Sequence, residues 1–235
     1  MKEKVTFFLP TRKGSERVKS KNTKPFANFN GGLIENKISQ LVKTRLLDEI
    51  ILSTNDEICM EIVRKYAVVD SRIRIIPRPE DLCLSSTNLQ DVITYVPTIT
   101  DAEHIIWGHV TTPLASAEQY DTGIQLYMDN LSNGFDSLVG VTEFKNFLLD
   151  NDGRIVNNNT DKPWPRTQDL TPLYEINHTM FIAKREIYVN QKNRIGIRPF
   201  LYVMDAIHSF DIDWPDDFVI AEALYKNLYC NKKGM

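Results

Sequence analysis

The sequence predicts an α/β fold with a mostly parallel central sheet flanked by helices. Strand-like and helix-like segments alternate through the first half of the chain, which is the pattern of a parallel sheet covered on both faces. The chain has 235 residues, enough for one such domain with a complete core. Its 42% of hydrophobic and 25% of charged residues are typical of a globular protein. We therefore expect a single domain over residues 1–235.

The segments of the first half can be assigned in order from their hydrophobic patterns. Apolar runs predict strands over residues 5–9, 50–53, 73–76 and 104–107. Apolar residues at helical spacing predict helices over residues 33–47, 88–98 and 117–130. Asp56 is a suitable N-cap for a further helix that carries Ile58, Ile62 and Val63.

The pattern changes after Gly134. Residues 137–142, 174–183 and 200–204 are strand-like, and a last helix is expected over 215–229 with Pro215 in its first turn. Asp152-Gly153 is typical of a hairpin turn. The proline-rich residues 162–166 predict a loop, either over the site or as an arm between subunits. We expect an inserted subregion over about 143–200 that holds a hairpin or lid and a dimerisation surface.

The overall charge and the cysteine pattern exclude several functional classes. The net charge is −3, whereas proteins that bind nucleic acid usually present a basic face. No apolar run approaches the length of a membrane span. Cys59, Cys83 and Cys230 are odd in number and far apart, which indicates reduced thiols and no disulfide or metal framework. We therefore expect a cytoplasmic protein with no nucleic-acid or membrane partner.

The loop after the first predicted strand is strongly basic, although the whole chain is slightly acidic. A basic, glycine-containing loop after a strand can hold a polyphosphate, because cations and backbone N–H groups face the anion. The alternative is a solvated basic loop. The chain has no G-x-x-x-x-G-K-[ST] and no G-x-G-x-x-G motif, which excludes a P-loop and a dinucleotide fingerprint. The basic residues of this loop are Arg12, Lys13, Arg17, Lys19, Lys21 and Lys24.

A pair of aspartates near the C-terminus is the second chemical feature. Asp211 and Asp213 would point to the same face of an extended segment, because side chains alternate there with period two. Two carboxylates form a hard oxygen site of the kind that Mg²⁺ uses together with substrate phosphates. The alternative is that Asp213 caps the following helix and Asp211 is solvated. Together with the basic loop, the pair predicts a site that binds a nucleoside triphosphate and a metal ion.

Several motifs, taken in order along the chain, resemble a known family. The sequence P-T-R-K-G-S-E-R-V-K-S-K-N-T-K-P at 10–25, R-P-E-D-L at 78–82, T-T-P-L at 111–114 and D-I-D at 211–213 are its characteristic segments. This family is the cytidylyltransferases that activate acidic nine-carbon sugars, namely the acylneuraminate (CMP-sialic acid) synthetases and their pseudaminic and legionaminic relatives. The resemblance spans nearly the whole chain.

The resemblance implies a Rossmann-like, GT-A-like nucleotidyltransferase. It would form a homodimer, use CTP and Mg²⁺, and transfer CMP to a sialic-acid-like or other acidic sugar with release of pyrophosphate. The implied catalytic residues are Arg12, Lys21 and Asp211, and the implied metal ligands are Asp211 and Asp213. The implied nucleotide-binding residues are Pro10, Arg12, Gly14, Ser15, Arg17, Lys21, Asn22 and Arg78. The implied acceptor-binding residues are Thr111, Thr112, Arg166, Glu175, Asn177 and His178.

The chain departs from the family pattern at several positions that affect these expectations. Glu16 replaces a usual Lys of the basic loop, and His109 stands where Gln is usual. Glu175 stands where the sialic-acid type has an Arg, and its charge would repel a sugar carboxylate, which argues against plain sialic acid. Arg166 could still meet an acid group. Two alternatives therefore remain, a phosphonate or sugar phosphate acceptor, and a non-catalytic nucleotide-binding homologue.

Overall fold

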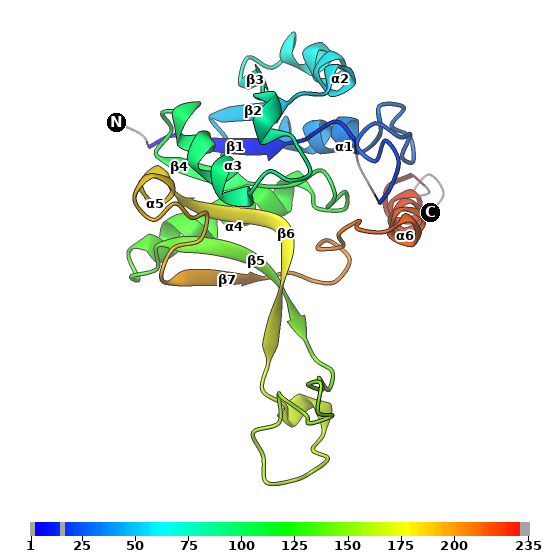
Figure 1. The fold of residues 1–235 in the computed structure, drawn as a ribbon, viewed down its shortest axis with the longest axis vertical. Helices are drawn as coiled ribbons and strands as arrows, with labels where there is room; N and C mark the ends of the chain where they lie inside the picture. Colours follow the sequence, from blue (N-terminus) through cyan, green and yellow to red (C-terminus); the bar gives the residue numbers. More distant parts are fainter. Residues whose placement is uncertain (1–2, 15–16, 231–235) are drawn as a thin grey trace.

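The computed structural model describes residues 3–14 and 17–230, and its centre is a seven-stranded sheet in the order β3-β2-β1-β4-β6-β5-β7 (Figure 1). Neighbouring strands run parallel except where β6 meets β4 and β5, so the sheet is mostly parallel, as the sequence predicts. The strands are β1 (Val5–Pro10), β2 (Glu49–Thr54), β3 (Ile73–Pro77), β4 (His104–Trp107), β5 (Ser137–Phe144), β6 (Leu173–Lys184) and β7 (Pro199–Val203).

Helices cover both faces of the sheet, and β1 shows why. Phe7 and Leu9 belong to one buried cluster with apolar side chains of α1, α2 and α4, whereas Phe8 belongs to a second cluster with Val92 of α3. This alternation along one buried strand is what a two-faced sheet requires. The helices are α1 (Gly32–Leu41), α2 (Glu57–Ala67), α3 (Leu89–Tyr95), α4 (Ala117–Leu131), α5 (Arg185–Asn190) and α6 (Pro215–Tyr225).

The helix expected over residues 33–47 is shorter than the apolar pattern predicts and ends at Leu41. Residues 42–47 turn away because distant side chains satisfy their backbone groups. The guanidinium of Arg72 donates to the carbonyls of Val42, Thr44 and Leu47, and the carboxylate of Asp121 accepts from two backbone N–H groups of the same segment. These long-range bonds replace the hydrogen bonds that a longer helix would make.

Other local predictions are confirmed with small boundary changes. Asp56 accepts a hydrogen bond from the backbone N–H of Ile58 and caps α2, and Pro215 begins α6. The last helix leaves α-helical geometry after Tyr225 and continues as a π-helical segment, Lys226–Cys230. The helix expected over residues 88–98 is α3 followed by a one-turn 3₁₀ helix.

The outer halves of β5 and β6 leave the sheet as a two-stranded ribbon, which with its connecting loop 145–172 forms the arm. Figure 1 shows the arm projecting from the body at the bottom of the view. The Asp152-Gly153 turn lies within it, and Gly153 has the positive φ of +78° that favours glycine. The strand register shifts between Val139 and Val141, and His178 opposite has a φ of +58°. Beyond the arm, the inner half of β6, α5 and β7 belong to the body.

Candidate active site

The candidate site is a cleft of about 450 Å³ beside the carboxyl ends of β1 and β4. Ligands of open α/β sheets bind at this edge, because the loops that follow parallel strands meet there. Gly14 lies in the loop after β1 with a φ of +84°, whereas Ser15 and Glu16 are outside the described residues. The predicted site residues that line the cleft are Pro10, Arg12, Arg17, Lys21, Asn22, Arg78, Thr111 and Asp213.

The basic loop meets the aspartate segment in this cleft, which Asp213 lines and Asp211 does not. Arg17 Nη1 donates to Asp213 Oδ1 at 2.7 Å, and Lys21 Nζ donates to the carbonyl of Ile212 at 2.8 Å. The backbone N–H of Ile212 donates to the carbonyl of Thr111, so residues 211–213 are held between the loops that follow β1 and β4. The two segments that the sequence analysis paired are therefore neighbours in space.

The alternative that Asp213 caps the last helix does not describe the structure. The N-cap position of α6 is Trp214, and the carboxylate of Asp217 accepts from the backbone N–H groups of Asp213 and Trp214. Asp211 is not freely solvated either, because its Oδ1 is buried.

Burial and neighbouring charges oppose each other at the centre of the site. Burial lowers the pKa of the Lys21 ammonium, although Asp211 and Asp213 act in the opposite direction. Burial also raises the pKa of the Asp211 carboxyl, and the charge of Asp213 adds to this, whereas a hydrogen bond from Thr111 and the charge of His178 oppose it. At both groups, burial outweighs the effect of the neighbouring opposite charges.

The aspartate pair fits a divalent cation. Asp211 Oδ1 is buried without a hydrogen-bond partner in the described part of the chain, and an unpaired buried carboxylate oxygen is costly unless a ligand satisfies it. Within residues 3–14 and 17–230, no group of three or more His, Cys, Asp or Glu side chains is arranged to hold a metal ion. Mg²⁺ usually takes only one or two carboxylates and completes its coordination with water and substrate phosphates, so a pair is sufficient.

Arg78 and Asn22 shape the cleft through the backbone of the basic loop. The guanidinium of Arg78 is buried and donates to the carbonyl of Thr11 at 2.5 Å and to Cys83 Sγ at 3.1 Å. The Asn22 amide donates to the carbonyl of Arg12 at 3.2 Å. Both side chains thus hold the start of the loop in place next to the cleft.

The expected acceptor residues fall into two groups. Thr111 lines the cleft, Thr112 is buried beneath it, and Asn177 is buried where it accepts from the backbone N–H of Thr179. His178 reaches the site, since its ring centroid lies 5.7 Å from that of His109, which lines the cleft.

The second group lies on the arm, and the structure does not bring it to the cleft of the same chain. Arg166 bonds Asp169 in the arm loop, and Glu175 lies exposed on the outer half of β6 opposite Thr142. Glu175 is only three positions from His178 in the sequence, but it lies on the part of β6 that projects into the arm.

Comparison with known proteins decides the family. The cytidylyltransferase family model matches residues 6–234. The chain belongs to this family. Similar proteins include the N-acylneuraminate cytidylyltransferase of Streptococcus agalactiae, 26% identical over 90% of this chain and 51% of the relative, and the pseudaminic acid cytidylyltransferase of Campylobacter jejuni, 25% identical over 93% and 94%. This cytidylyltransferase chain thus spans about half the length of the streptococcal relatives that it matches.

Solved structures support the same fold. A 4-diphosphocytidyl-2C-methyl-D-erythritol synthase from Anaerococcus prevotii superimposes with a TM-score of 0.67 at 15% identity and covers 95% of this chain and 96% of that chain. A CMP:2-keto-3-deoxy-manno-octonic acid synthetase complexed with CTP gives a TM-score of 0.66 at 14% identity, over 95% and 99% of the two chains. The cytidylyltransferase chain therefore has the nucleotidyltransferase fold that the resemblance implied.

Two residues near the site, Lys37 and Arg194, were missed by sequence reasoning. Lys37 is fully buried and donates to the carbonyl of Thr112 and to the hydroxyl of Tyr120. The helical periodicity places Lys37 on the apolar face of α1, next to Ile38, and its burial could have been predicted from that position. Arg194 follows the short helix α5, and its charge acts on His109. Arg194 does not belong to a charge cluster in the sequence, so no local pattern indicates it.

Proposed function

We propose that this chain transfers CMP from CTP to an acidic, sialic-acid-like sugar and releases pyrophosphate. The observation that carries the proposal is the contact between the basic loop and the aspartate segment inside one cleft, at the edge of the sheet where α/β folds bind ligands. Relatives named for N-acylneuraminate and pseudaminic acid support the class of acceptor. On the side of the site expected to bind the acceptor, this chain differs from the family motif at His109, Glu175 and His178.

The proposed roles follow from charge and position. Arg12, Arg17 and Lys21 bind the triphosphate, since cations in a partly buried cleft stabilise charge that moves between phosphates. Asp211 and Asp213 would hold Mg²⁺, which when bound neutralises negative charge on the phosphates. The Thr111 carbonyl accepts from the backbone N–H of Ile212 and holds the aspartate segment in place.

The reaction is an in-line displacement at the α phosphorus. A bond forms between the sugar hydroxyl oxygen and the α phosphorus, the bond from that phosphorus to the bridging oxygen of pyrophosphate breaks, and the hydroxyl proton leaves to solvent. Such transfers depend mainly on positioning and on electrostatic stabilisation. The side chains around the cleft are suited to both tasks.

We also propose a homodimer formed through the arm and the neighbouring strands. Exposed apolar side chains gather on the outer half of β6 and on the edge strand β7, including Ile176 and Val203, and an exposed apolar strand edge favours association. Arg166 lies in the arm loop and does not line the cleft of its own chain, so it would meet an acceptor only in the cleft of the other subunit. No helix in the described residues is long and apolar enough to cross a membrane.

Pyrophosphate release tests the proposal. Purified protein is supplied with Mg²⁺, each of the four ribonucleoside triphosphates, and N-acetylneuraminic acid, pseudaminic acid, 2-keto-3-deoxy-manno-octonic acid, a phosphonate or a sugar phosphate. We expect turnover with CTP and at least one sugar acid. Turnover only with the phosphonate or the sugar phosphate would move the acceptor to the other class. A CTP-induced rise in melting temperature without any turnover would support a non-catalytic homologue instead.

A further inference from the structure

Arg194 lies behind two residues of the cleft wall, Trp107 and His109, without lining the cleft itself. Its Nη1 is buried and has no hydrogen-bond partner among residues 3–14 and 17–230. The guanidinium carbon lies 3.8 Å from the ring centroid of Phe181 and 5.0 Å from that of Trp107, so aromatic faces surround it. Burial lowers the pKa of this guanidinium, opposed by the Tyr188 phenol and by no carboxylate in the described chain. Aromatic contacts compensate a buried cation only in part, and its N–H groups still require an oxygen acceptor.

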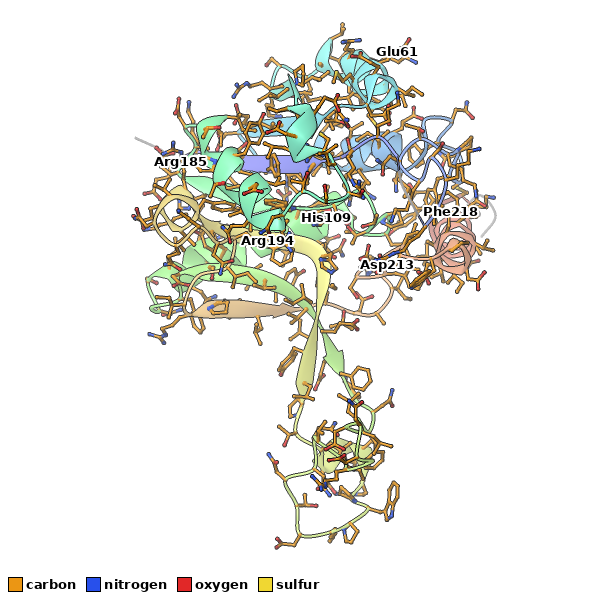
Figure 2. All side chains as sticks on the ribbon, viewed as in Figure 1. Glu61, His109, Arg185, Arg194, Asp213 and Phe218 are labelled. Carbon is orange, nitrogen blue, oxygen red and sulfur yellow. The ribbon has the colours of Figure 1, made fainter. Side chains whose placement is uncertain are left out.

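The neighbours of Arg194 connect it to the cleft. Trp107 and His109 both line the cleft, and Trp107 Nε1 donates to His109 Nε2 at 3.1 Å. Because the indole N–H can only donate, Nε2 must accept, and the neutral imidazole of His109 carries its proton on Nδ1. The His109 ring therefore offers a donor of its own. Figure 2 labels Arg194 and His109 next to each other beside β6, whereas Asp213 lies toward α6.

This end of the site is positively charged. Burial lowers the pKa of His109 well below its usual range, and the charges of Arg194, His178, Lys37 and Lys21 lower it further. The ring centroid of His178 lies 5.7 Å from that of His109, and the charge of His178 also acts on the Asp211 carboxylate. The site thus has carboxylates at one end and an unpaired guanidinium at the other.

We infer that Arg194, together with His109, binds the oxyanion of the acceptor. The inference rests on the proposed function and deepens it, because it assigns acceptor recognition to a residue of the body instead of Arg166 on the arm. A guanidinium suits this task, since its parallel N–H groups match a carboxylate or a phosphonate in a two-bond contact. An oxyanion bound between His109 and this guanidinium would supply the oxygen acceptor that the N–H groups of Arg194 need, and the acceptor hydroxyl would then extend toward Asp211.

The test separates acceptor binding from nucleotide binding. Steady-state KM values for CTP and for the acceptor are measured in wild type, Arg194→Gln and Arg194→Lys. Arg198→Gln is the matched control, because Arg198 follows in the same loop and also lies over a ring, that of Phe135, but is exposed. We expect Arg194→Gln to raise the acceptor KM about 10- to 100-fold, the usual scale of a hydrogen bond to a charged group, with the KM for CTP unchanged. Arg198→Gln should change neither.

The chemistry of the acceptor provides a second readout. Wild type should discriminate against the methyl ester of a sugar acid, or the monomethyl ester of a phosphonate, and Arg194→Gln should lose this discrimination. If the sugar acid and its ester are discriminated, the oxyanion is a carboxylate. If the phosphonate and its ester are discriminated, the oxyanion is a phosphonate. If Arg194→Gln does not fold, Arg194→Lys carries the test and should lose about 3- to 10-fold in acceptor KM alone, because an ammonium cannot replace the two-bond contact.

The outcomes that overturn the inference differ from those that overturn the proposed function. A folded Arg194 variant with the acceptor KM and the acid-to-ester ratio of wild type overturns the inference alone, and leaves Arg194 a packing residue between Trp107 and Phe181. Equal loss of CTP and acceptor binding also overturns it. Absence of turnover by wild type with every acceptor overturns the proposed function and the inference with it.

Discussion

Arg17 Nη1 bonds Asp213 Oδ1 at 2.7 Å across an interval of 196 residues in the chain. This ion pair joins the cation expected at the phosphates to the carboxylate expected at the metal ion. Both side chains are about half exposed, at 53% and 55%, so the pair is weak and easily exchanged for other partners. Without a nucleotide, the two groups neutralise each other. Binding of Mg²⁺ and CTP would separate them, each to a partner of opposite charge.

The first prediction concerns this exchange. Arg17→Gln should raise the affinity for a divalent cation in the absence of CTP by about two- to fivefold, because an exposed ion pair contributes at most about 1 kcal/mol. The affinity of Arg17→Gln for CTP should fall, because the variant lacks a cation that is proposed to bind the triphosphate. Free Mn²⁺, used in place of Mg²⁺, can be counted by electron paramagnetic resonance. Lys13→Gln is the control, since Lys13 is exposed in the same loop, and equal Mn²⁺ affinity in wild type and Arg17→Gln would contradict the exchange.

The second prediction concerns the buried carboxylate. Asp211→Asn should abolish metal-dependent turnover and leave the melting temperature equal or higher, because burial already disfavours the ionised form of Asp211. Pyrophosphate release and circular dichroism measure the two effects. Asp216→Asn, an exposed residue in the first turn of α6, should keep full activity. Normal turnover of Asp211→Asn would remove the aspartate pair from the mechanism.

The third prediction concerns Lys37, whose burial lowers the pKa of its ammonium to about 7, with Asp211 acting in the opposite direction. Since this pKa is below the ordinary value of 10.5, the unfolded chain binds more protons than the folded chain between about pH 7 and 10.5. Stability contributed by this group should therefore rise with pH in that window, by up to about 1.4 kcal/mol per pH unit. Below pH 7 its contribution should be constant.

Chemical denaturation of wild type and Lys37→Met at several values between pH 7.5 and 9.5 measures this effect. Only wild type should show the added slope, and it should be the more stable at high pH because Lys37→Met leaves the carbonyl of Thr112 and the hydroxyl of Tyr120 without their donor. Burial raises the pKa of Tyr120, so this phenol does not titrate in the window. Lys43→Met, at an exposed site just beyond α1, is the control. Parallel curves for wild type and Lys37→Met would contradict the prediction.

The fourth prediction concerns association. Sedimentation should show a dimer at micromolar concentration, and Ile176→Asp on the outer half of β6 should convert it to a monomer, because a charge on an apolar interface is costly to bury. Val69→Asp is the matched control, since Val69 is exposed beyond α2, on a different part of the body. A monomeric wild type, or a dimer that tolerates Ile176→Asp, would contradict the proposed interface.

The alternating elements and the basic loop could be predicted because their signals are local. Buried strands such as β1 are continuous apolar runs, and the charge density after β1 is visible in the sequence itself. The end of α1 at Leu41 could not be predicted, because it depends on Arg72 and Asp121 from distant segments. Arg194 was missed for the same reason, since its aromatic neighbours come from β4 and β6.

The central claim is that the basic loop and the aspartate pair act on one nucleoside triphosphate. Calorimetric titration of CTP with and without Mg²⁺, in wild type, Lys21→Ala and Asp211→Asn, tests it most directly. We predict that Mg²⁺ raises the CTP affinity of wild type at least about tenfold, a gain of about 1.4 kcal/mol. Asp211→Asn should lose this gain, and Lys21→Ala should bind CTP more weakly even without Mg²⁺. An Asp211→Asn protein with the full Mg²⁺ effect, or a Lys21→Ala protein with wild-type affinity, would contradict the claim.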